Sequence, residues 1–151
     1  MNTENFTTSI LVSQTPQEAF NAINNVRAWW SGEIQGKTGT VGDEFTYRYK
    51  DMHRSTQKVT ELVSGKKVVW DVVDASLSFT DNETEWKGTT IIFDIAVKGK
   101  ETEIRFTHQG LTPHCECYGA CSEGWSMLIN DNLRQLIASG KNQPDVFAES
   151  A

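Results

Sequence analysis

The amino-acid sequence predicts an α+β domain, and two observations carry the prediction. Between residues 44 and 108, apolar side chains return at every second position in several short runs, which is the period of a strand with one buried face. Between residues 121 and 140, apolar side chains return at helical spacing instead. Because runs of strands followed by a helix form antiparallel sheets, we expect such a sheet to pack against the long C-terminal helix.

Length and charge define the broad class of protein. The 151 residues fit one domain with a single core, and the ends, at 1–4 and 142–151, are expected to fray. The 14 Lys and Arg against 20 Asp and Glu give a net charge of −6, which argues against nucleic acid as a partner. The chain lacks a signal peptide and an apolar run long enough to span a membrane, so we expect a cytoplasmic protein. Its three cysteines are expected to be reduced thiols.

The N-terminal elements follow from local patterns. Residues 6–13 alternate as a strand. Thr15 as N-cap, Pro16 at N1 and Glu18 at N3 form a capping box, so a short helix is predicted to begin at Pro16. Two weaker segments follow, a second short helical turn and then a weak strand with its loop, at 26–31 and 32–42.

Five strands are predicted next, at 42–49, 55–63, 66–74, 90–97 and 103–108. The second and third are joined across Ser64-Gly65, and the last two form the clearest hairpin. Asp71 and Asp94 are out of phase with the neighbouring aromatic residues and are expected to face away from the interior. The polar loop near 80–88 contains an isolated Trp86.

The long helix is predicted to have one buried side. Gly140 follows its last apolar residues as a stop signal. Asn132 lies near the middle of the apolar stripe, where an unsatisfied carboxamide costs roughly 1–3 kcal/mol, so it must find a hydrogen-bond partner. The stripe itself consists of Trp125, Leu128, Ile129, Leu133, Leu136 and Ile137.

A family resemblance is carried by short strings along nearly the whole chain: WWS at 29–31, GDEFTYRY at 42–49, FTHQGL at 106–111, ECY at 116–118, Cys121, GW at 124–125 and LRQLIASG at 133–140. In their order and spacing they resemble the SRPBCC (START-like, Bet v 1-like) superfamily and, within it, the Activator of Hsp90 ATPase homologue-like proteins. The resemblance implies a helix-grip fold, in which a curved antiparallel sheet of about six to seven strands surrounds the C-terminal helix over a hydrophobic cavity.

The resemblance implies little about activity, because the superfamily includes lipid carriers, ligand receptors, cyclases and co-chaperone domains. The eukaryotic Hsp90 activator is similar to this chain only in its C-terminal domain and carries an additional N-terminal domain. The 151 residues leave no room for a second domain of that kind, so a chaperone partner is not expected.

The candidate ligand-binding residues are those predicted to point from the sheet and the helix into the interior. They either line a cavity for an apolar or aromatic ligand or simply fill the core. They are Trp30, Phe45, Tyr47, Tyr49, Trp70, Phe93, Phe106, His108, Trp125, Leu128 and Asn132.

Two polar residues of this set have both a structural and a functional interpretation. His108 shares a phase with Phe106 and should face the helix, where it bonds to a neighbouring group, to a ligand, or acts as a general base. Asn132 bonds to water or a main-chain carbonyl, or to a polar group of a ligand. If the helix begins near Thr112-Pro113, His114 is in phase with Asn132 and has the same two interpretations.

A metal site is not predicted, although His114, Cys115, Cys117 and Cys121 invite one. Residues seven apart on a helix lie about 10.5 Å apart along its axis, too far for the two to reach one tetrahedral ion. Thiols packed as small apolar groups are the simpler interpretation. No inward carboxylate pair, nucleophile elbow or phosphate-binding glycine motif occurs, so neither a cofactor nor a catalytic set of residues is predicted.

The leading functional hypothesis is a small-molecule binding protein for a hydrophobic or aromatic ligand. A first alternative is a cyclase- or hydrolase-like enzyme that uses the same cavity with His108 as acid or base. A second alternative is a protein-interaction domain, either a homodimer formed through an exposed sheet edge or a co-chaperone-like contact.

Overall fold

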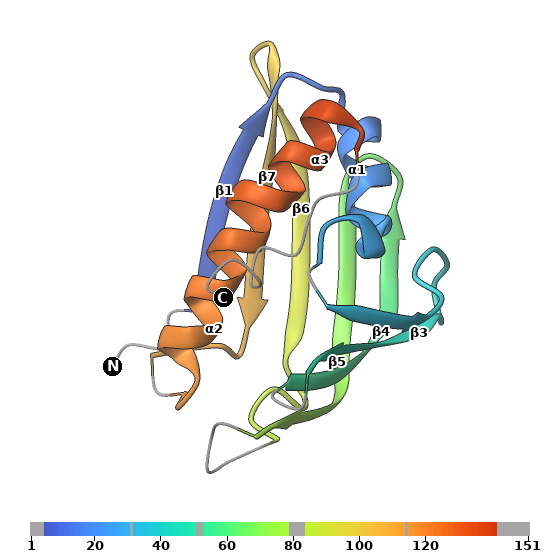
Figure 1. The fold of residues 1–151 in the computed structure, drawn as a ribbon. Coiled ribbons are helices and arrows are strands. Elements are labelled where there is room, and N and C mark those ends of the chain that lie inside the picture. The colour runs from blue at the N-terminus through green and yellow to red at the C-terminus, as the bar shows by residue number, and fades with distance from the viewer. Residues whose placement is uncertain (1–4, 31, 51–52, 79–83, 114, 142–151) are drawn as a thin grey trace.

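The computed structural model of the protein describes residues 5–30, 32–50, 53–78, 84–113 and 115–141. In this part of the chain, seven antiparallel strands form one sheet in the order β1-β7-β6-β5-β4-β3-β2 (Figure 1). The predicted α+β class and the antiparallel sheet are confirmed. The strands are β1 (Phe6–Val12), β2 (Glu33–Gly36), β3 (Glu44–Tyr49), β4 (His53–Val63), β5 (Lys67–Leu77), β6 (Thr90–Lys98) and β7 (Glu101–Gln109).

The sheet curves where β4 and β5 pair. Their register shifts between Thr56 and Gln57 and again between Val59 and Glu61, and such irregularities bend a strand and increase its twist. The turn between the two strands lies at the predicted place, and Gly65 has a φ of 70°, which favours glycine. Asp71 and Asp94 are exposed on the outer face, as predicted.

One continuous helix crosses the inner side of the sheet in front of β1, β7 and β6 (Figure 1). It comprises α2 (Tyr118–Met127), a π-helical segment η2 (Leu128–Leu133) and α3 (Arg134–Ser139). Gly140 ends it in the left-handed conformation with a φ of 74°, which confirms the predicted stop. The helix begins at Tyr118, not near Thr112-Pro113, and the sequence pattern did not predict the π-helical segment.

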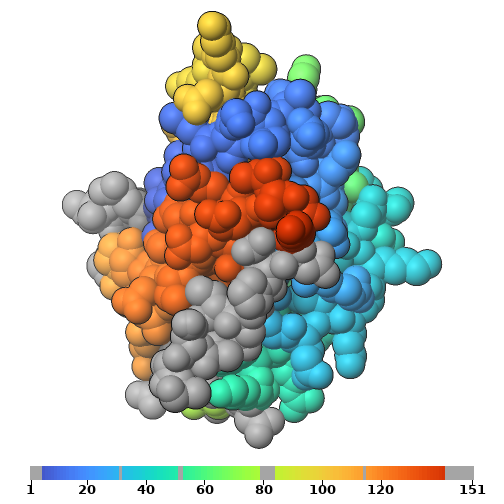
Figure 2. All heavy atoms as spheres, turned by 45° about the horizontal axis from the view of Figure 1, so that its top comes forward, coloured from blue at the N-terminus to red at the C-terminus, as the bar shows by residue number. Residues whose placement is uncertain are grey.

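The first strand is followed by α1 (Pro16–Asn24) and a single 3-10 turn, η1 (Val26–Ala28). The predicted capping box of α1 is confirmed, because the Glu18 N–H donates to Thr15 Oγ1 at 3.2 Å and the Thr15 N–H donates to Glu18 Oε1 at 3.0 Å. α1 lies beside α3 on the helical face of the molecule, while the tip of the β6–β7 hairpin projects beyond it (Figure 2). Within the described ranges, no helix has the length and apolarity needed to cross a membrane.

Replacing Thr15 by Ala should lower the free energy of unfolding by about 1 kcal/mol, because the Glu18 N–H at the start of α1 loses its side-chain acceptor. Chemical denaturation measures the loss. Thr40→Ala is the matched control, since Thr40 is exposed and its hydroxyl bonds to no described residue; it should change stability by less than about 0.5 kcal/mol. Equal losses in both variants would contradict the assignment of the cap.

Candidate ligand-binding site

The candidate site is the aromatic interior between the sheet and the helix. The Trp30 ring lies 4.2 Å from the Tyr47 ring and 6.1 Å from the Trp70 ring, centroid to centroid, with interplanar angles of 20° and 6°. Trp125 of α2 approaches Trp30 to 5.0 Å and Phe106 to 4.6 Å. Stacked and edge-on rings of this kind contribute about 0.5–1.5 kcal/mol per pair beyond the burial of their surfaces.

Ten of the eleven candidate residues are buried, and the structure brings them together in one core. Tyr49 is the exception: it is partly buried, and the Lys50 ammonium lies 5.4 Å from the centre of its ring. The aromatic members contact one another, so they build the core as well as the candidate site. That they line a ligand cavity stays a prediction.

A separate hollow lies between β1 and the C-terminal helix. It has a volume of about 320 Å³ and is lined by Ser9, Ile10, Leu11, Asn130 and Arg134. None of these residues belongs to the predicted set. The hollow adjoins the open edge of the sheet, not the aromatic interior.

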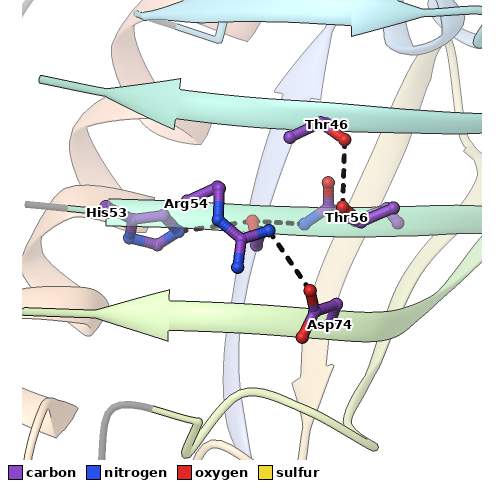
Figure 3. A network of polar contacts seen from close by, with 7 residues as sticks. Thr46, His53, Arg54, Thr56 and Asp74 are labelled. Carbon is purple, nitrogen blue, oxygen red and sulfur yellow. Dashed lines mark hydrogen bonds and ion pairs between the residues drawn. The ribbon is translucent and has the colours of Figure 1, made fainter. Parts of the chain in front are cut away.

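Strand β4 adds a line of polar side chains that sequence reasoning missed. Ser55 pairs with Tyr47 and Gln57 pairs with Phe45 across the β3–β4 ladder, so both point into the aromatic interior, where both are fully buried. The Gln57 amide donates to Ser55 Oγ, and His53 Nε2 lies 3.4 Å from the same oxygen (Figure 3). The signal was present in the sequence, because these three residues share a phase with Val59 and are polar where an inward phase should be apolar.

The next residues of β4 face the opposite way. Arg54 donates to Asp74 at 3.2 Å, and the Thr46 and Thr56 hydroxyls are 2.9 Å apart (Figure 3). The arginine and aspartate side chains are 42% and 50% exposed, so solvent screens this ion pair and it contributes little to stability. Arg54 and Thr56 thus lie on the outward side of β4, and His53, Ser55 and Gln57 lie on its inward side.

Two buried polar atoms in the interior have no hydrogen-bond partner among the described residues: Gln57 Oε1 and Trp70 Nε1. Both side chains are fully buried. Gln57 pairs with Val72 and Val59 pairs with Trp70, so the two side chains are diagonal neighbours on the inner face. A buried polar group left unpaired costs about 1–3 kcal/mol. The presence of an unpaired acceptor and an unpaired donor in this interior therefore needs a physical reason.

His108 faces the helix, as predicted, and its hydrogen bonds fix its tautomer. The Trp125 indole N–H donates to His108 Nδ1 at 3.0 Å, so the imidazole proton resides on Nε2. Nε2 lies 2.8 Å from Thr89 Oγ1, and the Thr89 hydroxyl donates to the Trp86 carbonyl at 2.6 Å. Both ring nitrogens are therefore engaged by neighbouring side chains.

Both interior histidines are held neutral. Burial lowers the pKa of His53 from 6.5 to about 3. Burial also lowers the pKa of His108 from 6.5 to about 3, and the nearby His53 adds to that effect. A protonated imidazole at the fully buried position of His108 would lack solvation.

Trp86, which stands alone among polar residues in the sequence, is packed into the core. Its ring is buried against His53 and His108, at 4.5 Å and 4.7 Å, and stacks on Trp125 at 5.8 Å. Its indole N–H donates to Cys117 Sγ at 3.3 Å. Polar neighbours in the sequence hid this contact, because burial here comes from distant elements.

The preceding residue anchors the same segment to the start of α2. The Glu85 carboxylate accepts from the Glu116 N–H at 2.7 Å and from the Cys117 N–H at 3.1 Å. A carboxylate at this position is also favoured by the helix dipole.

The cysteines act as packed thiols in the described structure. All three are free, and Cys117 and Cys121 are buried. A hydrogen bond from the Cys121 thiol lowers the pKa of Cys117, and the same bond raises the pKa of Cys121. Among the described residues, no three His, Cys, Asp or Glu side chains are grouped to hold a metal ion. His114, which the sequence interpretation included, lies outside those residues.

Asn132 bonds to a main-chain carbonyl, which is the structural interpretation given above. It lies in the π-helical segment η2, and its amide donates to the Trp29 carbonyl at 3.0 Å. The bond joins the middle of the helix to the connection that follows η1. Leu128, from the same segment, packs in the core beside it.

A curved antiparallel sheet around a C-terminal helix, with an aromatic interior between them, defines the helix-grip class of the SRPBCC superfamily. Residues 16–138 match the family described as Activator of Hsp90 ATPase homolog 1-like protein. The chain belongs to this family, as the sequence resemblance predicted. No curated protein is detectably similar in sequence.

Solved structures support the same assignment. The Aha1 dimer from Colwellia psychrerythraea is 25% identical, with a TM-score of 0.73 over 91% of this chain and 98% of that one. Protein MLL2253 from Mesorhizobium loti is 18% identical, with a TM-score of 0.67 over 87% and 96% of the two chains. Protein SSP2350 from Staphylococcus saprophyticus is 13% identical, with a TM-score of 0.66 over 95% and 98%. The last two show the fold alone.

The neutral histidines predict a pH-dependent stability. Between pH 6.5 and about 3 the unfolded chain binds more protons at His53 and His108 than the folded chain does. The contribution of the two neutral histidines to the free energy of unfolding should therefore be fully present above pH 6.5. As the pH drops below 6.5, the free energy of unfolding should fall by up to about 1.4 kcal/mol per pH unit for each histidine.

Urea denaturation at a series of pH values measures this slope. His53→Gln and His108→Gln should each flatten the curve below pH 6.5, because one titrating group is removed. A slope that is unchanged in both variants would show that other groups cause the pH dependence.

Proposed function

We propose that the protein binds a small, largely apolar or aromatic molecule in the interior between β3, β4, β5 and the C-terminal helix. The observation that carries the proposal is the pair of buried, unpartnered atoms among the described residues, Gln57 Oε1 and Trp70 Nε1, within an aromatic environment. A few polar groups placed among aromatic side chains are typical of small-molecule sites. Bonds from a ligand to these two atoms would offset the cost of about 1–3 kcal/mol that each unpaired buried group carries.

The π-helical segment η2 supports a site at this level of the helix. π-helical turns are rare, are less favourable than α-helix and occur frequently at functional sites. Leu128 and Asn132 of η2 face the interior and are buried. Asn132 bonds to the Trp29 carbonyl, and the Trp29 ring stacks on that of Trp70 at 6.5 Å, which supports a link between η2 and the proposed site.

The geometry favours binding over catalysis by His108. Its Nδ1 accepts from Trp125 and its Nε2 bonds to Thr89, so neither nitrogen is directed at a third group. A general base needs a nitrogen within hydrogen-bond reach of the proton that it abstracts. His108 instead ties β7 to α2 and to the Trp86 segment.

The proposal is tested by thermal shift and native mass spectrometry against panels of lipids, aromatic compounds and polyketide-like compounds. A ligand present at about 100 times its Kd should stabilise the folded protein by about 2.7 kcal/mol and raise its Tm by several degrees. Mass spectrometry should show a complex of one ligand per chain. A protein whose Tm no compound raises would contradict the proposal.

A matched pair of variants on β5 locates the site. Ala75 is buried opposite Ser55, whereas Val73 is 38% exposed. Ala75→Leu fills the interior, at a cost of about 1–3 kcal/mol, and should abolish the ligand-induced shift. Val73→Leu should keep it. Loss of the shift in both variants would place the ligand elsewhere.

A homodimer is the second candidate function, and the open edge of β1 favours it. β1 contains no charged residue or proline and pairs with β7 over seven residues without a register shift. At the other end of the sheet, β2 has four residues and so offers a partner strand little to pair with. Natural sheets usually protect a long edge strand with charge, proline or bulges, so an unprotected β1 indicates a partner strand.

The simplest partner for an edge strand without charged residues is a second copy of β1 in antiparallel orientation. Leu11 is 47% exposed beside this edge and would gain an apolar contact. The similar protein from Colwellia psychrerythraea is described as a dimer, which agrees with the idea.

Ser9→Lys places a charge at the middle of β1 and should convert a dimer to a monomer, measured by light scattering at several protein concentrations. Gln35→Lys, on the short edge strand β2, is the control and should leave the dimer intact. A wild-type protein that is monomeric at every concentration would remove this candidate.

A further inference from the structure

The interior offers a ligand one hydrogen-bond acceptor and one donor, on the neighbouring strands β4 and β5. Gln57 uses its amide N–H₂ on Ser55, which leaves Oε1 as the atom directed into the interior. Trp70 contributes an indole N–H, a donor that cannot accept. Because the two residues are diagonal neighbours on β4 and β5, one molecule can reach both atoms.

The same interior carries no formal charge. In the described part of the chain, the buried polar residues are Ser55, Gln57, Thr102, His108 and Asn132, so none is Lys, Arg, Asp or Glu. Burial keeps the pKa of His53 and His108 at about 3, so neither supplies a positive charge near neutral pH. An ionised ligand would lose its hydration without meeting a counter-charge, whereas a neutral ligand would not.

The surfaces around Gln57 and Trp70 are flat rings. Tyr47, Trp30 and Trp70 lie nearly parallel, at 20° and 6° to one another along the series. Trp30 belongs to the connection between η1 and β2, and its buried ring stacks on those of both Tyr47 and Trp70. Flat aromatic surfaces of this kind favour a flat ring system as their partner.

We infer that the ligand is a neutral, flat aromatic molecule with an N–H or O–H donor beside a carbonyl acceptor, as in an aromatic lactam. Its donor bonds to Gln57 Oε1, and its carbonyl accepts from Trp70 Nε1–H. Fatty acids and other ionised amphiphiles are excluded by the same chemistry. The inference rests on the proposed function and specifies its ligand.

Three probes of similar size separate these features: 2-quinolone, which is neutral with a donor and an acceptor; N-methyl-2-quinolone, which lacks the donor; and 2-naphthoate, which is an anion. Isothermal titration calorimetry measures their affinities for the wild-type protein. We expect 2-quinolone to bind about tenfold or more tightly than either of the others, because each of these leaves a buried group unpaired or a charge uncompensated.

Gln57→Met removes the acceptor and keeps an unbranched side chain of similar length. It should weaken 2-quinolone binding about tenfold and leave the affinity for N-methyl-2-quinolone unchanged, whereas a merely structural defect would weaken both. Trp70→Phe removes the donor and should weaken both quinolones, since both carry the carbonyl. Thr56→Val, at the outward neighbour of Gln57 on β4, is the control and should change neither affinity.

The possible outcomes separate this inference from the proposed function. Equal affinities for 2-quinolone and 2-naphthoate, or for the two quinolones, would overturn the inference while the function stands. Binding of a lipid or another panel compound, but of none of the three probes, would do the same. If no compound of any panel binds the wild-type protein, both the inference and the proposed function are wrong.

Discussion

The indole of Trp125 joins the helix to the sheet, and much of the interior is arranged around it. Its ring contacts Trp30, Trp86 and Phe106, which come from three different parts of the chain. Its N–H donates to His108 on β7. A single residue of the helix therefore combines apolar packing with one directional bond, and that bond fixes both the rotation of the helix and the tautomer of the histidine.

The hydrogen bond to His108 extends into the segment that carries Trp86. The Thr89 hydroxyl bonds to the imidazole and to the Trp86 carbonyl, and Trp86 bonds to Cys117 at the start of α2. Glu85 accepts two N–H groups from the same end of the helix. Glu85 and Trp86 are thus held to the start of α2, the first by its carboxylate and the second by its indole N–H.

Much of the fold could be predicted from the sequence because local patterns and burial agree in most elements. The capping box of α1, the hairpin of β6 and β7 and the stop at Gly140 each depend on neighbouring residues, which a sequence displays directly. The inward direction of His108 followed from the strand period. The π-helical segment could not be predicted, because its backbone geometry depends on packing that the apolar stripe does not encode.

The candidate site was only partly predictable, and the reason is physical. Aromatic residues in an inward phase report burial but not whether a ligand or another ring covers them. Ser55 and Gln57 were missed because polar residues on a strand normally indicate the exposed face. Trp86 was missed because its partners, His53, His108 and Trp125, are distant in the sequence. For the aromatic residues and Trp86 the missing information was three-dimensional proximity, whereas the inward phase of Ser55 and Gln57 was present in the sequence.

The absence of formal charge from the described interior has a consequence for how this protein responds to its medium. The charged side chains of the described residues lie outside that interior, where dissolved ions reach and screen them. A neutral guest held by Gln57 and Trp70 makes no contact with those charges. Ionic strength should therefore alter the association of the protein with charged surfaces and with other copies of itself. Its affinity for such a neutral ligand should be nearly independent of salt.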